Sequence, residues 1–152
     1  MKELRVTPIK DGTVIDHIPS GLAVKVLKIL GIIEKPPKST VTVAMHVSSK
    51  KMKWKDIVKI EDRELDTREV NKIALIAPNA TISIIHDFSV VKKTRVQLPD
   101  TITNIVKCPN QSCITNKGEP VDKTFSVVNR DPVTVRCKYC ERVVDDIIGN
   151  FI

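Results

Sequence analysis

The sequence is poor in aromatic residues and contains no long apolar stretch. Trp, Tyr and Phe make up only 3% of the 152 residues. No segment approaches the roughly 18 apolar residues of a membrane-spanning helix, and the N-terminal residues lack the apolar core of a signal peptide. Hydrophobic residues nevertheless reach 41%, which is typical of a folded chain rather than a disordered one. We therefore expect a soluble, cytoplasmic protein without membrane association, with one main domain and a smaller appendage.

Motifs that mark common enzyme classes are also missing. The sequence has no G-x-S-x-G, no Walker A loop, no H-E-x-x-H and no G-x-G-x-x-G. Asp16 and His17 stand together at the end of a predicted strand and could form an acid–base pair. No nucleophile, open metal site or phosphate loop completes such a site. A free-standing enzyme is therefore a weaker hypothesis than a binding or regulatory protein.

Charge and cysteine are distributed unevenly along the chain. The net charge is +7, and residues 1–100 carry 18 Lys and Arg against 12 Asp and Glu, whereas residues 101–152 carry 7 against 6. All four cysteines lie in the second segment. We predict two domains, residues 1–96 and 104–152, with a linker at 97–103 where Pro99 interrupts strand and helix patterns. The basic first domain favours an anionic partner such as a nucleotide, a nucleic acid or an acidic protein.

Hydrophobic periodicity predicts alternating strands and helices in the first domain. Residues 40–47 alternate as a half-buried strand does. Ser20 is the expected N-cap of a helix ending near Gly31, and Asp66 with Glu69 has the spacing of a capping box for a second helix. Further strands are expected at 13–18, 56–60, 81–86 and 88–91. This order predicts an α+β fold of the split βαβ, ferredoxin-like type, an α/β sandwich with both helices on one sheet face.

The second domain is organised around Cys108, Cys113, Cys137 and Cys140. Their C-x4-C and C-x2-C pairs can surround one tetrahedral Zn²⁺ with four thiolates. Four protein ligands leave no open position for water, so we predict a structural zinc, one per chain. Two disulfides are the alternative, and they would require an oxidising compartment. Strands at 123–128 and 133–136 predict a small antiparallel β domain of the zinc-ribbon-like type.

Six short motifs follow one another along nearly the whole chain. They are Gly12-Thr-Val-Ile-Asp-His-Ile-Pro19, Lys55-Asp-Ile-Val-Lys-Ile-Glu61, Ala77-Pro-Asn-Ala-Thr81, Leu98-Pro99, Cys108-Pro-Asn with Cys113-Ile, and Cys137-Lys-Tyr-Cys-Glu141. Together they resemble the regulatory chain of aspartate carbamoyltransferase, the allosteric subunit of an enzyme of pyrimidine biosynthesis. The resemblance implies a non-catalytic subunit that binds CTP and ATP, with UTP as a third candidate, in its first domain. It also implies a zinc domain that docks on the trimers of catalytic chains.

The resemblance further implies which residues carry these functions. Adjacent Lys92 leaves the choice of Lys93 as a phosphate contact open by one position. We place the contacts with the catalytic chain at Asn110, Lys138 and Glu141, which flank the cysteine turns. Regulatory chains of the family pair as homodimers through their allosteric domains, and the strand at 40–47 is a candidate edge for that contact. The implied nucleotide contacts are Val6, Ile9, Val14, Asp16, His17, Lys55, Lys59, Ser83, Ile85, Phe88, Val90 and Lys93.

A nucleic-acid-binding protein of the zinc-ribbon type is the main alternative. It would explain the basic charge and the four cysteines. The cysteine-containing segment is nearly neutral, however, and Tyr139 is its sole Tyr or Trp, so it offers little of the usual basic and aromatic surface. We therefore expect a hetero-oligomeric regulatory subunit that does not bind nucleic acid.

Overall fold

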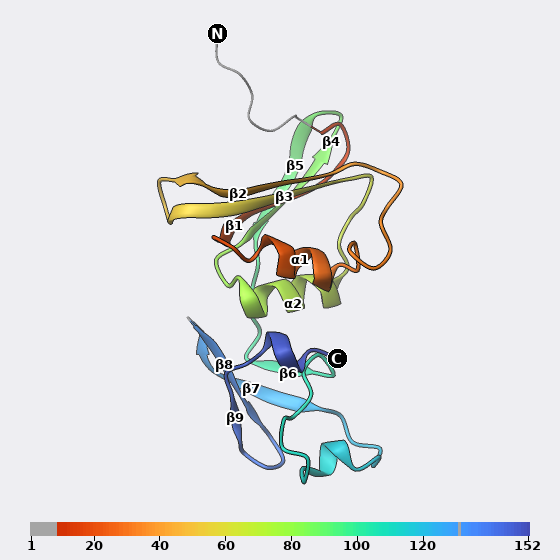
Figure 1. Cartoon of the computed structure of the whole chain (residues 1–152), viewed down its shortest axis with the longest axis vertical. Helices are drawn as coiled ribbons and strands as arrows, with labels where there is room; N and C mark the ends of the chain where they lie inside the picture. The colour runs from red at the N-terminus through yellow and green to blue at the C-terminus, as the bar shows by residue number, and fades with distance from the viewer. Residues whose placement is uncertain (1–8, 131) are drawn as a thin grey trace.

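The computed structural model describes residues 9–130 and 132–152, and it contains two antiparallel sheets with a pair of helices between them (Figure 1). No helix in this described part of the chain is long and apolar enough to cross a membrane. The first part comprises β1 (Gly12–Pro19), α1 (Ala23–Ile29), β2 (Val41–Ser49), β3 (Lys53–Glu61), α2 (Thr67–Ile76), β4 (Thr81–His86) and β5 (Ser89–Arg95). The second comprises β6 (Thr101–Thr103), the 3₁₀ turn η1 (Ile114–Asn116), β7 (Thr124–Arg130), β8 (Val133–Cys137), β9 (Val143–Val144) and the 3₁₀ turn η2 (Ile148–Asn150).

The first sheet has the strand order β2-β3-β1-β4-β5, and every neighbouring pair is antiparallel. Both helices lie on the side of this sheet that faces the second sheet (Figure 1). The α+β, ferredoxin-like fold predicted from the sequence is therefore confirmed, with β5 as an additional edge strand. The other side of the sheet carries no helix among the described residues, and we call it the open face.

The two helices begin in different ways. Helix α2 has the predicted capping box, in which the Asp66 side chain accepts from the Glu69 N–H and the Glu69 side chain accepts from the Asp66 N–H. The prediction that Ser20 caps α1 is wrong. Helix α1 is instead capped by Asp56 of β3, whose Oδ2 accepts hydrogen bonds from the N–H groups of Gly21 at 2.9 Å and Ala23 at 3.0 Å. Asp56 is fully buried. Its hydrogen bonds therefore take the place of the water molecules that would solvate an exposed carboxylate.

Bulges interrupt the alternation of β1 and β2. Each strand carries one extra residue opposite β3, at His17 in β1 and at His46 in β2, and both histidines have positive φ values of 58° and 56°. The bulge in β2 shifts its side chains between the two faces. The strand predicted at 40–47 is present as β2, but the bulge interrupts its alternation after Ala44. Because β2 is also an edge strand, Val43 and Met45 are exposed.

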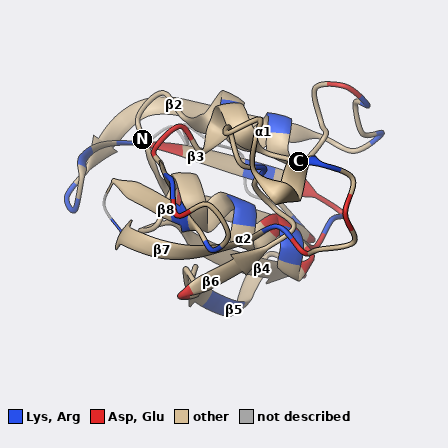
Figure 2. Cartoon of the chain, turned by 90° about the horizontal axis from the view of Figure 1, so that it is seen from below, with Lys and Arg blue, Asp and Glu red and all other residues tan. Residues whose placement is uncertain are grey.

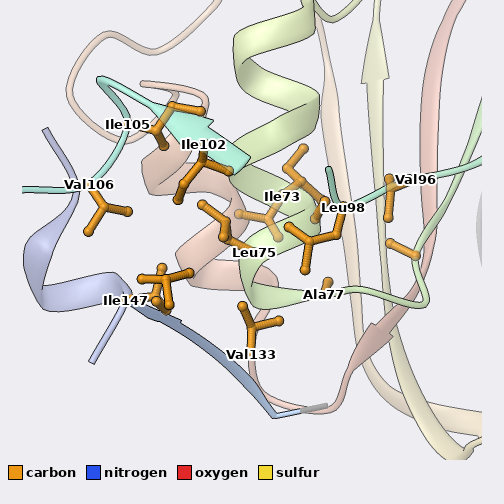
Figure 3. Packing of buried hydrophobic residues seen from close by; sticks show 14 of the residues in the cluster. Ile73, Leu75, Ala77, Val96, Leu98, Ile102, Ile105, Val106, Val133 and Ile147 are labelled. Atoms are coloured by element: carbon orange, nitrogen blue, oxygen red, sulfur yellow. The ribbon is translucent and has the colours of Figure 1, made fainter. Parts of the chain in front are cut away.

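The helices and the second sheet share one continuous hydrophobic core. Figure 3 shows Ile73 and Leu75 of α2 among side chains of the second sheet and its C-terminal segment, including Ile102 of β6 and Ile147. Leu75 is 2% exposed and Ile147 is 5% exposed. Helix α2 therefore contributes to the packing of both parts of the chain.

The second sheet has the order β6-β7-β8-β9 and is antiparallel throughout. Residues 101–103, which the sequence placed in a linker, form β6 and pair with β7 from Thr101 opposite Ser126 to Thr103 opposite Thr124. The C-terminal residues return to this part of the chain, where Val106 bridges to Phe151 and the Ile152 N–H bonds to the Ile105 carbonyl. The small antiparallel β domain predicted from the sequence is confirmed.

Candidate metal centre and open sheet face

The four cysteines come together at one end of the second sheet. Cys108 and Cys113 lie on the loop before η1, and Cys137 and Cys140 flank the turn between β8 and β9. All four thiols are free, and their sulfur atoms lie within 4.8 Å of one another. The Cys108 and Cys140 sulfurs are 3.5 Å apart, and those of Cys113 and Cys137 are 3.7 Å apart. The disulfide alternative is therefore wrong for this structure.

These separations fit a single tetrahedral metal ion. Zn–S bonds of about 2.3 Å at tetrahedral angles place sulfur atoms about 3.8 Å apart. Burial raises the pKa of Cys108 to about 12. Burial acts in the same direction on Cys140, but hydrogen bonds from the Arg142 backbone, the Asn110 side chain and the Cys108 and Cys137 thiols together outweigh it and lower its pKa to about 7. Four ionised thiols this close would repel one another, so the cluster needs a bound cation to hold them as thiolates.

Hydrogen bonds fix both cysteine turns. The side-chain amide of Asn116 donates to the carbonyls of Cys108 and Asn110, each at 2.8 Å. Thr115 donates to the Cys113 sulfur at 3.1 Å from a buried position. In the second turn the Glu141 N–H bonds to the Cys137 carbonyl at 3.0 Å, and Glu141 adopts a positive φ of 64°. The ligand positions are therefore held by contacts of the protein itself.

The predicted contacts with a catalytic chain lie on the surface around this cluster. Lys138 and Glu141 are exposed and Asn110 is half-buried. Exposed apolar side chains accompany them, namely Ile114, Tyr139 and Val143, which are 46%, 46% and 47% exposed. Sequence periodicity did not identify these apolar residues as an interaction surface, because a turn between short strands has no repeat to analyse. The three predicted contacts stay a prediction.

A row of side chains crosses the open face of the first sheet. Strand pairing places Lys59 of β3 opposite Val14 of β1, Val14 opposite Ser83 of β4, and Ser83 opposite Lys93 of β5. Directly paired residues in an antiparallel sheet point to the same face. Three strand spacings separate the two lysines, which is about 14 Å between their Cα atoms. Two cationic groups therefore flank a shallow surface formed by Val14 and Ser83.

Asp16 and His17 lie next to this row, at the bulge of β1. The Lys55 ammonium lies 2.9 Å from the Asp16 carboxylate, and His17 Nδ1 lies 3.1 Å from the Thr81 hydroxyl. Burial lowers the pKa of His17, Asp16 opposes this, and Lys55, Lys51 and Lys93 lower it further. The imidazole is consequently favoured in its neutral form beside an excess of lysine charge. Thr81 was not among the predicted site residues, because only the strand register places it opposite Asp16.

A third bulge lies at Val91, between Val90 and Lys92. The β4–β5 register shifts by one residue, so that Ile85 pairs with Val90 while Ser83 pairs with Lys93. Val90 and Lys93 therefore share the open face although they are three positions apart, a spacing that would put them on opposite faces of a regular strand. Lys92 points to the helix side, where it lines a groove beside α2. The geometry thus selects Lys93, rather than Lys92, as the lysine of the open face.

The remaining predicted nucleotide contacts are placed less uniformly. Ile85 shares the open face with Ser83. Phe88 is 63% exposed at the β4–β5 turn with a positive φ of 65°, and Ile9 is buried before β1. Val6 lies outside the described residues. The structure brings Val14, Asp16, Lys55, Lys59, Ser83, Ile85, Val90 and Lys93 to one face, with His17 at its border.

These features define a two-domain chain, in which an α+β domain with a basic open face is joined to a small β domain carrying a four-cysteine metal site. Two family models agree with this description. The model for the allosteric domain of the aspartate carbamoyltransferase regulatory chain matches residues 4–97, and the model for the metal binding domain of the same chain matches residues 100–148. The chain therefore belongs to the family of aspartate carbamoyltransferase regulatory chains.

Individual relatives match over nearly their full length. The regulatory chain of Thermoplasma volcanium is 52% identical over 145 residues, which cover 95% of each chain. That of Methanothrix thermoacetophila is 52% identical over 151 residues, covering 99% of this chain and 97% of the relative. That of Pyrococcus abyssi is 52% identical over 146 residues, covering 96% and 95%. All three are named as regulatory chains of an enzyme, and the four-cysteine cluster lies within the metal-binding match.

Proposed function

We propose that the open face binds one nucleoside triphosphate, CTP or ATP, and that the two compete for it. The observation that supports this is the row from Lys59 to Lys93, with Asp16 beside it. The lysines serve as point charges for the phosphate chain, and the Asp16 carboxylate accepts hydrogen bonds from ribose hydroxyls. Val14 and the aliphatic side chains near it provide an apolar surface for the base. UTP, with the same phosphates and ribose, is a third ligand of this class.

Calorimetric titration of CTP into the metal-loaded chain tests this assignment. Lys93→Ala should weaken binding about tenfold, because a hydrogen bond to a charged group contributes about 1.5–3 kcal/mol. Lys92→Ala is the matched control, since it removes the same charge one residue away on the opposite face, and it should change the affinity less than about twofold. ATP should displace CTP. An equal loss of CTP affinity in the two variants, or no saturable CTP binding to the unsubstituted chain, would refute the proposal.

The metal of the cysteine cluster is, in this proposal, Zn²⁺. Four thiolates suit zinc, and they also suit iron, so the donor set alone does not decide between them. The residues Cys108, Cys113, Cys137 and Cys140 would hold the ion, which supplies a fixed tetrahedral crosslink between the two turns. Elemental analysis of the purified chain should find one zinc per chain. Iron at that stoichiometry would contradict the assignment.

The partner of the metal-binding domain is, in this proposal, the catalytic chain of aspartate carbamoyltransferase. Asn110, Lys138 and Glu141 would contact it, together with the exposed Tyr139 beside them. Because the ligand turns hold this surface, removal of the metal by a chelator should abolish co-elution with catalytic trimers on a sizing column, and added Zn²⁺ should restore it. Co-elution of the metal-free chain would refute this part.

Nucleotide binding then regulates the enzyme through a difference in affinity. CTP and ATP must each favour a different quaternary state, because a ligand that binds both states equally shifts neither. We further propose a homodimer through β2, an edge strand with exposed Val43 and Met45 that can pair with a second copy. The chain itself contributes regulation rather than chemistry.

A further inference from the structure

A cavity of about 410 Å³ lies where α1 and α2 meet the C-terminal segment, far from the strand row of the open face. Its walls come from both parts of the chain. Helix α1 contributes Lys25, Lys28 and Ile29, helix α2 contributes Lys72, and residues 148–152 contribute apolar side chains that include Phe151. Figure 2 shows Lys and Arg segments on α1 and α2, seen from the side on which the C-terminus lies.

The charges around this cavity are predominantly positive. Lys25 and Lys28 are three residues apart on α1 and so share one face of the helix, and Lys72 approaches from α2. Glu34 carries the single side-chain carboxylate among the lining residues. Within residues 9–130 and 132–152, none of the ion pairs involves any of these three lysines. The three lysines therefore outnumber the one side-chain carboxylate of the cavity, and in this described part of the chain only Lys72 among them donates to an oxygen there, that of Ile152.

Lys72 is the least solvated of the three lysines. Its Nζ donates to the backbone oxygen of Ile152 at 3.2 Å and lies 5.8 Å from the centre of the Phe151 ring. Burial lowers the pKa of Lys72, and the positive charge of Arg68, one turn earlier on α2, lowers it further, while Glu69 and Asp66 oppose this in part. An anion placed beside this ammonium would offset both effects. A partly desolvated cation inside a cavity is a more specific feature than a lysine on an open surface.

We propose that this cavity binds a small phosphate-class anion, such as pyrophosphate or the phosphate chain of a nucleotide, between Lys25, Lys28 and Lys72. The three lysines line one cavity from two helices, which suits a ligand with several anionic oxygens. Such a ligand would contact α1, α2 and the C-terminal segment together. It would therefore hold the two parts of the chain against each other, independently of the open face.

Two-dimensional ¹H–¹⁵N NMR of the metal-loaded chain, titrated with pyrophosphate, tests the site directly. The background is Lys93→Ala, which removes a charge from the open face. Saturable shifts are expected for the amides of Ile29 and Gly149, beside the cavity. Lys72→Gln should weaken binding about tenfold, since it removes a charge-assisted hydrogen bond. Glu34→Gln should strengthen binding, and Lys117→Gln, a charge change elsewhere on the surface, should leave it unchanged.

The outcomes separate this site from the proposed nucleotide face. Shifts confined to the amides of Val14 and Ser83 would overturn the inference while leaving the open face intact. The absence of saturable shifts at Ile29 and Gly149 with both pyrophosphate and ATP would also overturn it. Shifts with both probes would identify the phosphate chain of a nucleotide as a ligand, and shifts with pyrophosphate alone would identify the free anion. Either of those results supports the site.

Discussion

Replacing Asp56 with Asn should destabilise the chain strongly, although the two side chains have nearly the same shape. The two Asp56 oxygens accept three backbone hydrogen bonds, from Gly21 at 2.9 Å, Ala23 at 3.0 Å and His46 at 2.8 Å. An amide has a single acceptor oxygen. If that oxygen keeps the bonds from Gly21 and Ala23, the amide NH₂ faces the His46 N–H, and two donors oppose each other in a buried site.

The magnitude follows from these three bonds. A hydrogen bond to a charged group contributes about 1.5–3 kcal/mol and a neutral one about 0.5–1.5 kcal/mol. Two bonds each weakened by about 1 kcal/mol and a third lost at about 2 kcal/mol give a total near 4 kcal/mol. For a chain of this size, each kcal/mol lowers the midpoint of thermal unfolding by about 2–4 °C. The expected decrease is therefore about 8–16 °C.

Fluorescence of Trp54, the single tryptophan and a neighbour of Asp56 on β3, provides the assay. Asp145→Asn is the control, because Asp145 is exposed and its substitution should cost less than about 0.5 kcal/mol. Hydrogen exchange of the Gly21 and Ala23 amides should accelerate in Asp56→Asn. A decrease in midpoint no larger than that of the control would show that these three bonds do not hold the start of α1, and the reasoning would fail.

Three further predictions concern the metal, the oligomer and pH. Cys113→Ser should remove the bound metal, measured by elemental analysis, and should abolish exchange protection in β7 and β8 while β1 and β4 keep theirs. Met45→Lys should convert the proposed dimer to monomer in sedimentation equilibrium, and Ile33→Lys, which charges another exposed apolar site, should not. Because the pKa of His17 is lowered from its ordinary value of 6.5 in the folded chain, the unfolded chain binds more protons than the folded chain as the pH drops below that value. Stability should therefore fall in that range, and His17→Gln should reduce this dependence. An unchanged pH profile in His17→Gln would contradict the assignment.

The sequence predicted those features that depend on nearby residues. Asp66 and Glu69 of the capping box are only three positions apart, so the local sequence was sufficient to predict the start of α2. The spacing of the four cysteines likewise indicated one cluster. By contrast, the cap of α1 comes from Asp56, which is more than thirty positions away, and no local pattern identifies it. Ser20 had a suitable residue type and position, but its hydroxyl instead bonds to His46 at 2.7 Å.

Bulges account for most of what the sequence did not predict. The extra residues are His17, His46 and Val91, and each one changes the face of the sheet that the following side chains occupy. The position of each bulge depends on the register with a neighbouring strand, which the local sequence does not reveal. Simple alternation would have placed Val90 and Lys93 on opposite faces. Strand β6 was missed for a different reason, because its three residues directly follow a proline-containing segment and are too short to show a period.

The core shared by α2 and the second sheet limits how this chain can be recombined with its relatives. Leu75 of α2 and Ile147 near the C-terminus are buried in the same hydrophobic cluster, although 72 positions separate them in the sequence (Figure 3). A chimaera that joins the first domain of this chain to the metal-binding domain of a relative about half identical in sequence would create mismatched volumes along that seam, and mismatched volumes in a packed core cost stability. Exchange of the two domains as modules should therefore succeed only when the facing residues of α2, β6 and the C-terminal segment are exchanged together.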